Sequence, residues 1–230
     1  MFHAAVLTWR GKDMQELIDK IINEGVHVGG GIVKLDSFLN HQVEPGLTLR
    51  MAVELCSQFQ ACGIDLVTKV VTAEVSGIPV ALGVASTFGA ELIYARKSRS
   101  ALMTGTYYVA EAISRTRGSH TDLMVDRRFL GPDDCVLIID DFLATGSTLS
   151  ALVRLVRERQ ANLVGIGCVI EKPAEGFAIS VLVIVPSLLD DPAPSSFLNL
   201  VKDKATPIEV EKITNQKKFE VKLYFSRYEK

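Results

Sequence analysis

The sequence lacks an excess of basic charge, and this absence argues against a general nucleic-acid binder. Its 25 Lys and Arg residues stand against 27 Asp and Glu residues, for a net charge of −2, whereas nucleic-acid-binding domains are usually basic. Hydrophobic residues make up 48% of the 230 positions and charged residues 23%. That balance excludes a disordered chain. It indicates one domain of ordinary size with a substantial core, with or without a small appendage.

Cysteine pairs at metal-binding or disulfide spacing are also missing. No two of the four cysteines form a C-x-x-C motif, and none has a histidine at ligand spacing. Their neighbours are mostly apolar, which indicates free thiols in a reducing compartment. The four residues are Cys56, Cys62, Cys135 and Cys168.

Long hydrophobic runs are scarce. The run ISVLVIVPSLL at residues 179–189 is too short to span a bilayer and contains Pro186. The first twelve residues lack the apolar stretch of a secretory signal. We therefore expect a cytoplasmic protein that binds neither membranes nor nucleic acid.

Strand and helix patterns alternate from residue 66 to residue 172, and this rhythm predicts an α/β fold with a mostly parallel sheet flanked by helices. The four consecutive apolar residues at 136–139 are typical of a strand that is covered on both faces. Strands are predicted over residues 32–35, 66–73, 90–97, 136–139, 162–172 and 217–225. Helices are predicted over residues 13–25, 47–61 and 80–88, and in the segment that follows residue 148.

Two segments carry little regular pattern. The stretch with Asn40, His41 and Gln42 reads as irregular. Residues 98–134 are polar and rich in Arg, Thr, Ser and Gly, which is typical of a long loop or lid. Within that segment, residues 106–112 have a pattern that would suit one side of a hairpin.

The most informative stretch is VLIIDDFLATGST, at residues 136–148. Asp140 and Asp141 follow the buried strand, at the end of a parallel sheet where ligands bind. Neighbouring carboxylates suit sugar hydroxyls or a hydrated Mg²⁺ ion. A loop of small and hydroxylated residues comes next and leads into a helix. The loop consists of Ala144, Thr145, Gly146, Ser147 and Thr148.

This loop has the composition of a phosphate site. Backbone N–H groups at a helix start attract anions, and Gly146 lets the backbone approach a ligand closely. A phosphorylated sugar carries both the hydroxyls and the phosphate that the stretch could bind. The alternative interpretation is a simple helix cap, which Thr and Ser often provide. A Walker loop is excluded because no Lys follows the glycine.

Taken together with four other segments, this stretch resembles the type I phosphoribosyltransferases, and the bacterial xanthine phosphoribosyltransferases most closely. The other segments are VKLDSFLNHQVEP at 33–45, TAEVSGIP at 72–79, YARKS at 94–98 and GIGCVIEK at 165–172. The resemblance implies an N-terminal extension at 1–12 and a phosphoribosyltransferase domain at 13–172. Residues 173–230 would form a diverged C-terminal segment, and three alternatives stay open for it: a hood with an edge strand, a replacement ending, or an altered reading of the same region.

The resemblance also implies roles for individual residues. Asp140 and Asp141 would face the ribose of 5-phosphoribosyl-1-pyrophosphate (PRPP), and the loop at 144–148 would hold its 5′-phosphate. Lys97 would reach the pyrophosphate, often in the neighbouring subunit. The backbone that holds the pyrophosphate would come from Glu74, Val75, Ser76 and Gly77. The purine would be bound by Val33, Asn40 and Lys172.

The reaction implied is transfer of the phosphoribosyl group of PRPP to xanthine, giving xanthosine 5′-monophosphate (XMP) and pyrophosphate in purine salvage. Mg²⁺ would be held by PRPP oxygens and waters near the two aspartates, without a direct protein ligand. The resemblance also implies that the protein is a homodimer. Lys172 favours a base with a 6-oxo group. The alternatives are a guanine, hypoxanthine or adenine phosphoribosyltransferase, and a PRPP-binding regulator without catalysis.

Overall fold

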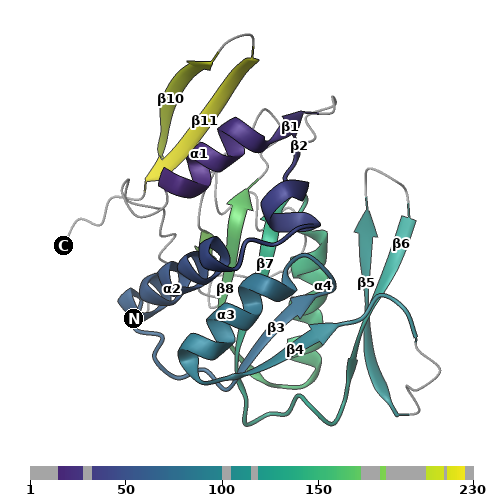
Figure 1. The fold of residues 1–230 in the computed structure, drawn as a ribbon. Helices are drawn as coiled ribbons and strands as arrows, with labels where there is room; N and C mark the ends of the chain where they lie inside the picture. The colour runs from purple at the N-terminus through teal and green to yellow at the C-terminus, as the bar shows by residue number, and fades with distance from the viewer. Residues whose placement is uncertain are drawn as a thin grey trace.

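The centre of the protein is a five-stranded sheet in the order β4-β3-β7-β8-β9 (Figure 1). The computed structural model describes residues 15–27, 33–99, 105–114, 119–171, 182–184, 206–214 and 217–225. Strands β4, β3, β7 and β8 run parallel, and β9 pairs antiparallel with β8. The predicted α/β fold with a mostly parallel sheet is therefore confirmed. The strands are β3 (Lys69–Ala73), β4 (Glu91–Ala95), β7 (Cys135–Leu143), β8 (Asn162–Glu171) and β9 (Leu182–Ile184).

Helices cover both faces of this sheet, as the continuous apolar run predicted. On β7, Leu137 and Ile139 belong to the core on the side of α2 and α3, while Val136 and Ile138 belong to the core on the side of α4. All four side chains are fully buried, because successive residues of a strand point to opposite faces. The helices are α2 (Pro45–Ala61), α3 (Ile78–Phe88) and α4 (Ser147–Glu158).

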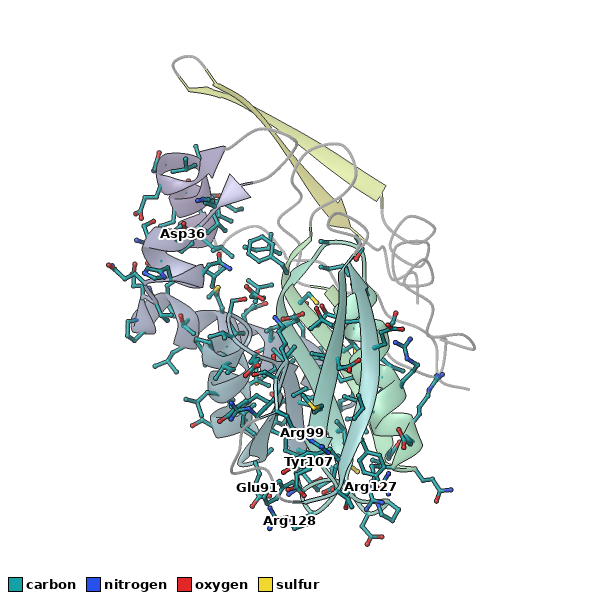
Figure 2. The ribbon with its side chains drawn as sticks, turned by 90° about the vertical axis from the view of Figure 1, so that its right-hand side faces the viewer. Asp36, Glu91, Arg99, Tyr107, Arg127 and Arg128 are labelled. Atoms are coloured by element: carbon teal, nitrogen blue, oxygen red, sulfur yellow. The ribbon has the colours of Figure 1, made fainter. Side chains whose placement is uncertain are left out.

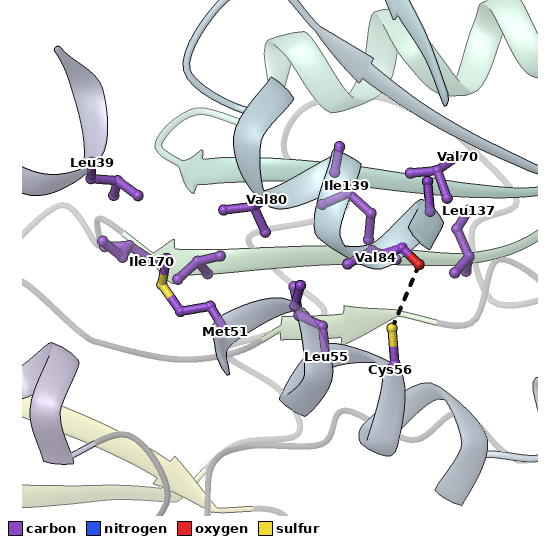
Figure 3. Packing of buried hydrophobic residues seen from close by; sticks show 14 of the residues in the cluster. Leu39, Met51, Leu55, Cys56, Val70, Val80, Val84, Leu137, Ile139 and Ile170 are labelled. Atoms are coloured by element: carbon purple, nitrogen blue, oxygen red, sulfur yellow. Dashed lines mark hydrogen bonds between the residues drawn. The ribbon is translucent and has the colours of Figure 1, made fainter. Parts of the chain in front are cut away.

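The core under α2 and α3 is close-packed (Figure 3). The Cys56 thiol lies within it and donates to the carbonyl oxygen of Val84 at 3.8 Å. Burial raises the pKa of this thiol to about 11. Cys168 is buried as well, and all four cysteines are free, as expected from their apolar neighbours.

Glycines on β8 let α2 approach the sheet. A Cβ atom at Gly165 would lie 2.7 Å from Cε1 of Phe59 and 2.8 Å from Cδ2 of Leu137. A Cβ at Gly167 would lie 3.0 Å from Cζ of the same Phe59 ring. The Phe59 ring therefore occupies the space that a side chain at either of these two glycine positions would need.

A small hood precedes the sheet in sequence and lies above the carboxyl ends of β7 and β8 in Figure 1. The hood packs on the core under α2 through Leu17, Phe38 and Leu39. The stretch expected to be irregular instead begins with a π-helical turn, in which the carbonyl oxygen of Leu35 accepts the N–H groups of Phe38, Leu39 and Asn40. The hood consists of α1 (Gln15–Glu24), β1 (Val26–His27), β2 (Val33–Lys34) and the turn η1 (Asp36–Asn40).

The segment expected to be a poorly patterned lid contains a hairpin, β5 (Tyr107–Ser114) and β6 (Ser119–Asp126). The side expected at residues 106–112 is confirmed as β5. Its inner face packs on α4, and Arg159 Nη1 donates to the Tyr108 hydroxyl at 2.7 Å. The expectation of an irregular segment was wrong for this part, because the inner face of β5 carries small alanines after Tyr108 and gives a weak apolar signal.

Two arginines of the 98–134 segment directly follow β6. Figure 2 shows Arg127 and Arg128 beside Tyr107, at the opposite end of the molecule from Asp36 in the hood. Arg128 pairs with Asp126 at 2.8 Å. Arg127 lies over the Tyr108 ring at 4.4 Å. Both therefore stabilise the base of the hairpin. Arg115 and Arg117, the other lid arginines, lie outside the described residues.

A second hairpin follows the sheet in sequence. The strand expected over residues 217–225 is β11 (Lys217–Phe225), which pairs antiparallel with β10 (Thr206–Thr214). Strand β9 also falls within the C-terminal segment and forms the edge of the main sheet. In the described part of the chain, no helix is both long and apolar enough to cross a bilayer.

The close approach of α2 to β8 can be tested with Gly165→Val. We expect this change to lower the free energy of unfolding by about 1–3 kcal/mol, because the added methyl groups must displace the Phe59 ring. Urea denaturation measures the difference. Gly131→Ala is the control, since its Cβ would lie no nearer than 3.8 Å to another side chain and should change stability by less than about 0.5 kcal/mol. Equal stability of Gly165→Val and wild type would contradict the packing.

Candidate functional site

The two aspartates, the turn at residues 74–77 and the loop at residues 144–148, all predicted as site residues, gather where the strand order reverses. From β3 the chain moves outward to β4, and from β7 it moves the other way to β8, so the reversal lies between β3 and β7. Ligands of open α/β sheets bind beyond the carboxyl ends of the strands at such a point. Strand β3 pairs with β7 only as far as Val71 and Ile138, whereas β7 pairs with β8 as far as Leu143. The two central strands therefore part where the acidic residues begin.

Asp140 and Asp141 lie within β7, and not after it as expected, because pairing with β8 continues past both. The two carboxylates are 7% and 4% exposed. Burial raises the pKa of Asp140 well above its usual range, and the charge of Asp141 adds to this, while the Lys97 ammonium opposes it. The Asp140 carboxylate also accepts the N–H of Asp141 at 3.1 Å. The pair is an acidic centre with little access to water, suited to hydroxyl donors or a cation.

The turn at residues 74–77 abuts this acidic centre. A Cβ atom at Gly77 would lie 2.8 Å from Oδ1 of Asp140 and still closer to Oγ1 of Thr72, so only glycine fits. The peptide bond between Glu74 and Val75 is cis. Among the backbone bonds of the described residues, none uses the N–H of Val75, Ser76 or Gly77 as a donor. These N–H groups directly precede α3, and N–H groups at helix starts are suited to anions.

Glu74 joins this turn to the end of β4. Its Oε1 accepts the backbone N–H of Lys97 at 2.5 Å, and its Oε2 lies 4.0 Å from Nε of Arg96. The N–H of Glu74 donates in turn to the carbonyl oxygen of Ala95 at 3.0 Å. The structure therefore brings the exposed Lys97 to the same edge of the sheet as the aspartates.

The loop at residues 144–148 leads from β7 into α4. Gly146 has φ of 76°, a left-handed conformation that favours glycine. Thr145 Oγ1 donates to the Ser147 hydroxyl at 3.1 Å and accepts the Ser147 N–H at 3.4 Å. The Asp141 carboxylate accepts a hydrogen bond from Asn40 of the hood. The stretch therefore does more than cap the helix α4. With its hydroxyls and the helix start, the loop has the chemistry of a phosphate site.

The hood reaches this centre through Asn40. Its Nδ2 donates to Oδ2 of Asp141 at 3.0 Å, across 101 positions of sequence. Val33 lies in β2, but its side chain is outside the described part. Lys172 also lies outside the described residues. Its neighbour Glu171 ends β8 and pairs with Leu143, just before the phosphate-type loop.

Sequence reasoning missed Thr72. This residue is fully buried on β3, and its Oγ1 has no hydrogen-bond partner among the described residues. It lies against Gly77, beside Asp140. A hydroxyl in the otherwise apolar run VVTA, just before the acidic turn, is the signal that could have found it.

The site offers a metal few protein ligands. Within the described ranges, no cluster of three or more His, Cys, Asp or Glu side chains could hold an ion. Asp140 and Asp141 provide two buried carboxylates, and burial of like charges favours a neighbouring cation. They fit a hydrated Mg²⁺ ion that keeps waters and ligand oxygens in its coordination shell, which is how Mg²⁺ is commonly bound.

The raised pKa of Asp140 predicts how stability depends on pH. An unfolded Asp has a pKa of about 3.9, so above that pH the folded chain retains a proton that the unfolded chain loses, and stability falls as pH rises. Asp140→Asn cannot ionise. We expect it to exceed wild type in free energy of unfolding at pH 7, with the difference vanishing below about pH 4.

Denaturation across a pH series measures this difference. The control is Asp36→Asn, which removes an exposed carboxylate of the hood. A wild type that gains stability relative to Asp140→Asn as pH rises would contradict the stated environment of Asp140.

Comparisons with known proteins show the family of this chain. The family model described as "Phosphoribosyl transferase domain" matches residues 65–187. A protein named xanthine phosphoribosyltransferase from Deinococcus deserti is 45% identical over 162 residues, which cover 70% of this chain and 82% of that protein. A protein of the same name from Geobacillus thermodenitrificans is 42% identical over 186 residues, covering 77% and 94% respectively.

A solved structure shares the fold. The structure of APRTase from Giardia lamblia, complexed with 9-deazaadenine, matches with a TM-score of 0.53 and 23% identity, covering 67% of this chain and 84% of that one. The family model and the relatives together settle the identity: the chain belongs to the phosphoribosyltransferase family, whose fold and activity class, glycosyl transfer, it shares.

Proposed function

We propose that this protein transfers the 5-phosphoribosyl group of PRPP to xanthine, giving XMP and pyrophosphate. One structural observation carries the proposal. Two buried carboxylates lie between a loop with phosphate-site chemistry and a turn whose N–H groups make no backbone hydrogen bond among the described residues, at the reversal of the strand order. The relatives named xanthine phosphoribosyltransferase, at 37–45% identity, support xanthine as the base.

Each part of PRPP has a matching surface. The ribose hydroxyls would donate to Asp140 and Asp141, which water reaches poorly. The 5′-phosphate would accept N–H and hydroxyl groups from the loop at residues 144–148, at the start of α4. The pyrophosphate would accept the N–H groups of Val75, Ser76 and Gly77. This arrangement holds the sugar at both ends and leaves C1 between the two anion sites.

The reaction breaks the bond between C1 and a pyrophosphate oxygen, and the bond electrons leave with the pyrophosphate. Positive charge develops on the ribose ring and is stabilised by the nearby carboxylates. A ring nitrogen of the base then bonds to C1 and loses its proton. When bound through PRPP oxygens and waters near Asp140 and Asp141, Mg²⁺ supplies positive charge that offsets the charge of the leaving group. Lys97 would add a further cation on the pyrophosphate.

The base would be recognised from the hood side. Asn40 presents both a donor and an acceptor, and its turn lies beside the carboxylates. Lys172 would donate to the 6-oxo group of xanthine, and the backbone at Val33 would border the ring. Guanine and hypoxanthine also carry a 6-oxo group, whereas the amino group of adenine gives a lysine donor no acceptor.

Assembly and location complete the proposal. We propose a homodimer in which Lys97 acts at the neighbouring subunit's pyrophosphate, as the family resemblance implies. We also propose a cytoplasmic location, since four free cysteines suit a reducing compartment.

Pyrophosphate release with PRPP and Mg²⁺ tests the proposal directly. We expect turnover with xanthine, with weaker use of guanine and hypoxanthine and none with adenine, because the lysine donor needs a 6-oxo acceptor. Turnover with adenine alone would reject xanthine as the substrate. Binding of PRPP without turnover of any base would favour a regulator.

The role of Lys97 can be tested by Lys97→Ala. Loss of a cation at the departing pyrophosphate should lower kcat by about a hundredfold, with little change in the KM for xanthine. Lys69→Ala is the matched control because Lys69 begins β3, at the opposite end of the strand, and pairs with the exposed Glu91. Its kcat should stay near that of wild type, and an equal loss in both variants would remove the special role of Lys97.

A further inference from the structure

The hydrogen bond from Asn40 to Asp141 joins the two halves of the site before any ligand binds. Asn40 belongs to the hood and Asp141 to the end of β7, and their side chains meet at 3.0 Å. The Asp141 side chain is buried, whereas Asn40 is exposed. The amide therefore reaches from the surface to occupy one oxygen of a carboxylate that has little room for other partners.

The backbone that carries Asn40 is firmly held. The carbonyl oxygen of Leu35 accepts the N–H of Leu39 at 3.0 Å and that of Asn40 at 3.2 Å. The neighbouring side chains of Phe38 and Leu39 are each 1% exposed and belong to the core under α2. Displacement of the amide from Asp141 therefore requires rotation of the Asn40 side chain alone, with the hood remaining in place.

Asn40 and a ribose hydroxyl would compete for the same carboxylate. A hydroxyl that donates to Oδ2 of Asp141 takes the position that the Asn40 amide holds in the free protein. A freed amide has two N–H donors and one oxygen acceptor to offer, and it stays anchored at the rim of the site, where the base would arrive.

We infer that Asn40 is an exchangeable occupant of the ribose site: PRPP displaces its amide from Asp141, and the released amide then binds the purine. The inference rests on the proposed function. Asn40 thereby makes purine binding depend on PRPP, since the amide is committed to Asp141 until the sugar arrives. The same side chain opposes PRPP binding and favours purine binding.

The opposite effects of Asn40 on PRPP binding and on purine binding distinguish an exchangeable side chain from a purely structural one. Asn40→Ala removes the amide that competes with PRPP for Asp141. We therefore expect PRPP to bind about fivefold more tightly, as measured by calorimetry with Mg²⁺ and without a base. The KM for xanthine should rise by about tenfold, because the base loses its amide partner. A side chain that only supported the hood would weaken both ligands together.

Two comparisons make the test specific. His41→Ala changes the adjacent exposed residue and should leave both constants within about twofold. In an Asp141→Asn background, Asn40→Ala should no longer tighten PRPP binding, because the competition for the carboxylate is gone. If Asn40→Ala does not fold, Asn40→Ser keeps a small polar residue at this exposed position and should show the same pair of opposite effects.

The outcomes are distinct. Tighter PRPP binding together with a higher xanthine KM supports the exchange. Unchanged or weaker PRPP binding by a folded Asn40 variant, with a wild type that binds PRPP and turns over, overturns the exchange and leaves the proposed function intact. A wild type that neither binds PRPP nor releases pyrophosphate overturns the proposed function and the exchange with it.

Discussion

Two adjacent carboxylates, held away from water at the end of β7, are the constraint around which the site is built. Burial and the charge of Asp141 both raise the pKa of Asp140, so the pair is costly for the free protein. Few groups offset that cost: the N–H of Asp141, the Asn40 amide and the nearby Lys97 ammonium. A ligand that brings hydroxyl donors and a cation to this point would supply the hydrogen bonds and the positive charge that the two carboxylates lack in the free protein.

The fold creates this point through its topology. Helices cover both faces of the sheet, so apolar side chains occupy the strands and polar chemistry is left to their ends. The reversal of strand order lets β3 and β7 part at Val71 and Ile138, and the turn of Gly77 lies against Asp140 at that point. Helices α3 and α4 both begin there. The two helix starts, which generally favour anions, thus lie on either side of the acidic centre.

Local patterns in the sequence predicted the features that depend on neighbours along the chain. The apolar run at 136–139, the paired acids and the hydroxyl-rich loop predicted a buried strand followed by a loop that leads into a helix, and the structure has this order in β7, the loop and α4. The continuation of β7 through the acids could not be read locally, since it depends on pairing with β8 up to Leu143. The bond between Asn40 and Asp141 spans 101 positions, and no periodicity reports such a contact. Of hairpin β5–β6, only the first strand was expected from the sequence, and its inner face carries the small side chains of Ala110 and Ala112, which give a weak apolar signal.

Some of the polar groups that lack a hydrogen-bond partner in the described part lie where the ligand would bind, and this placement links stability to function. Thr72 Oγ1 is buried without a partner in the described part, and the N–H groups at residues 75–77 make no backbone hydrogen bond there. Two other buried oxygen atoms of the described part, Oε1 of Gln58 on α2 and Oγ of Ser150 on α4, also lack a hydrogen-bond partner, so the unmet hydrogen-bonding capacity is not confined to the site. Locally inconsistent positions in an otherwise consistent sequence are expected at functional sites. Hydrogen bonds that these groups do not make in the unliganded fold could then be made with a phosphorylated sugar, and they would add to its binding free energy.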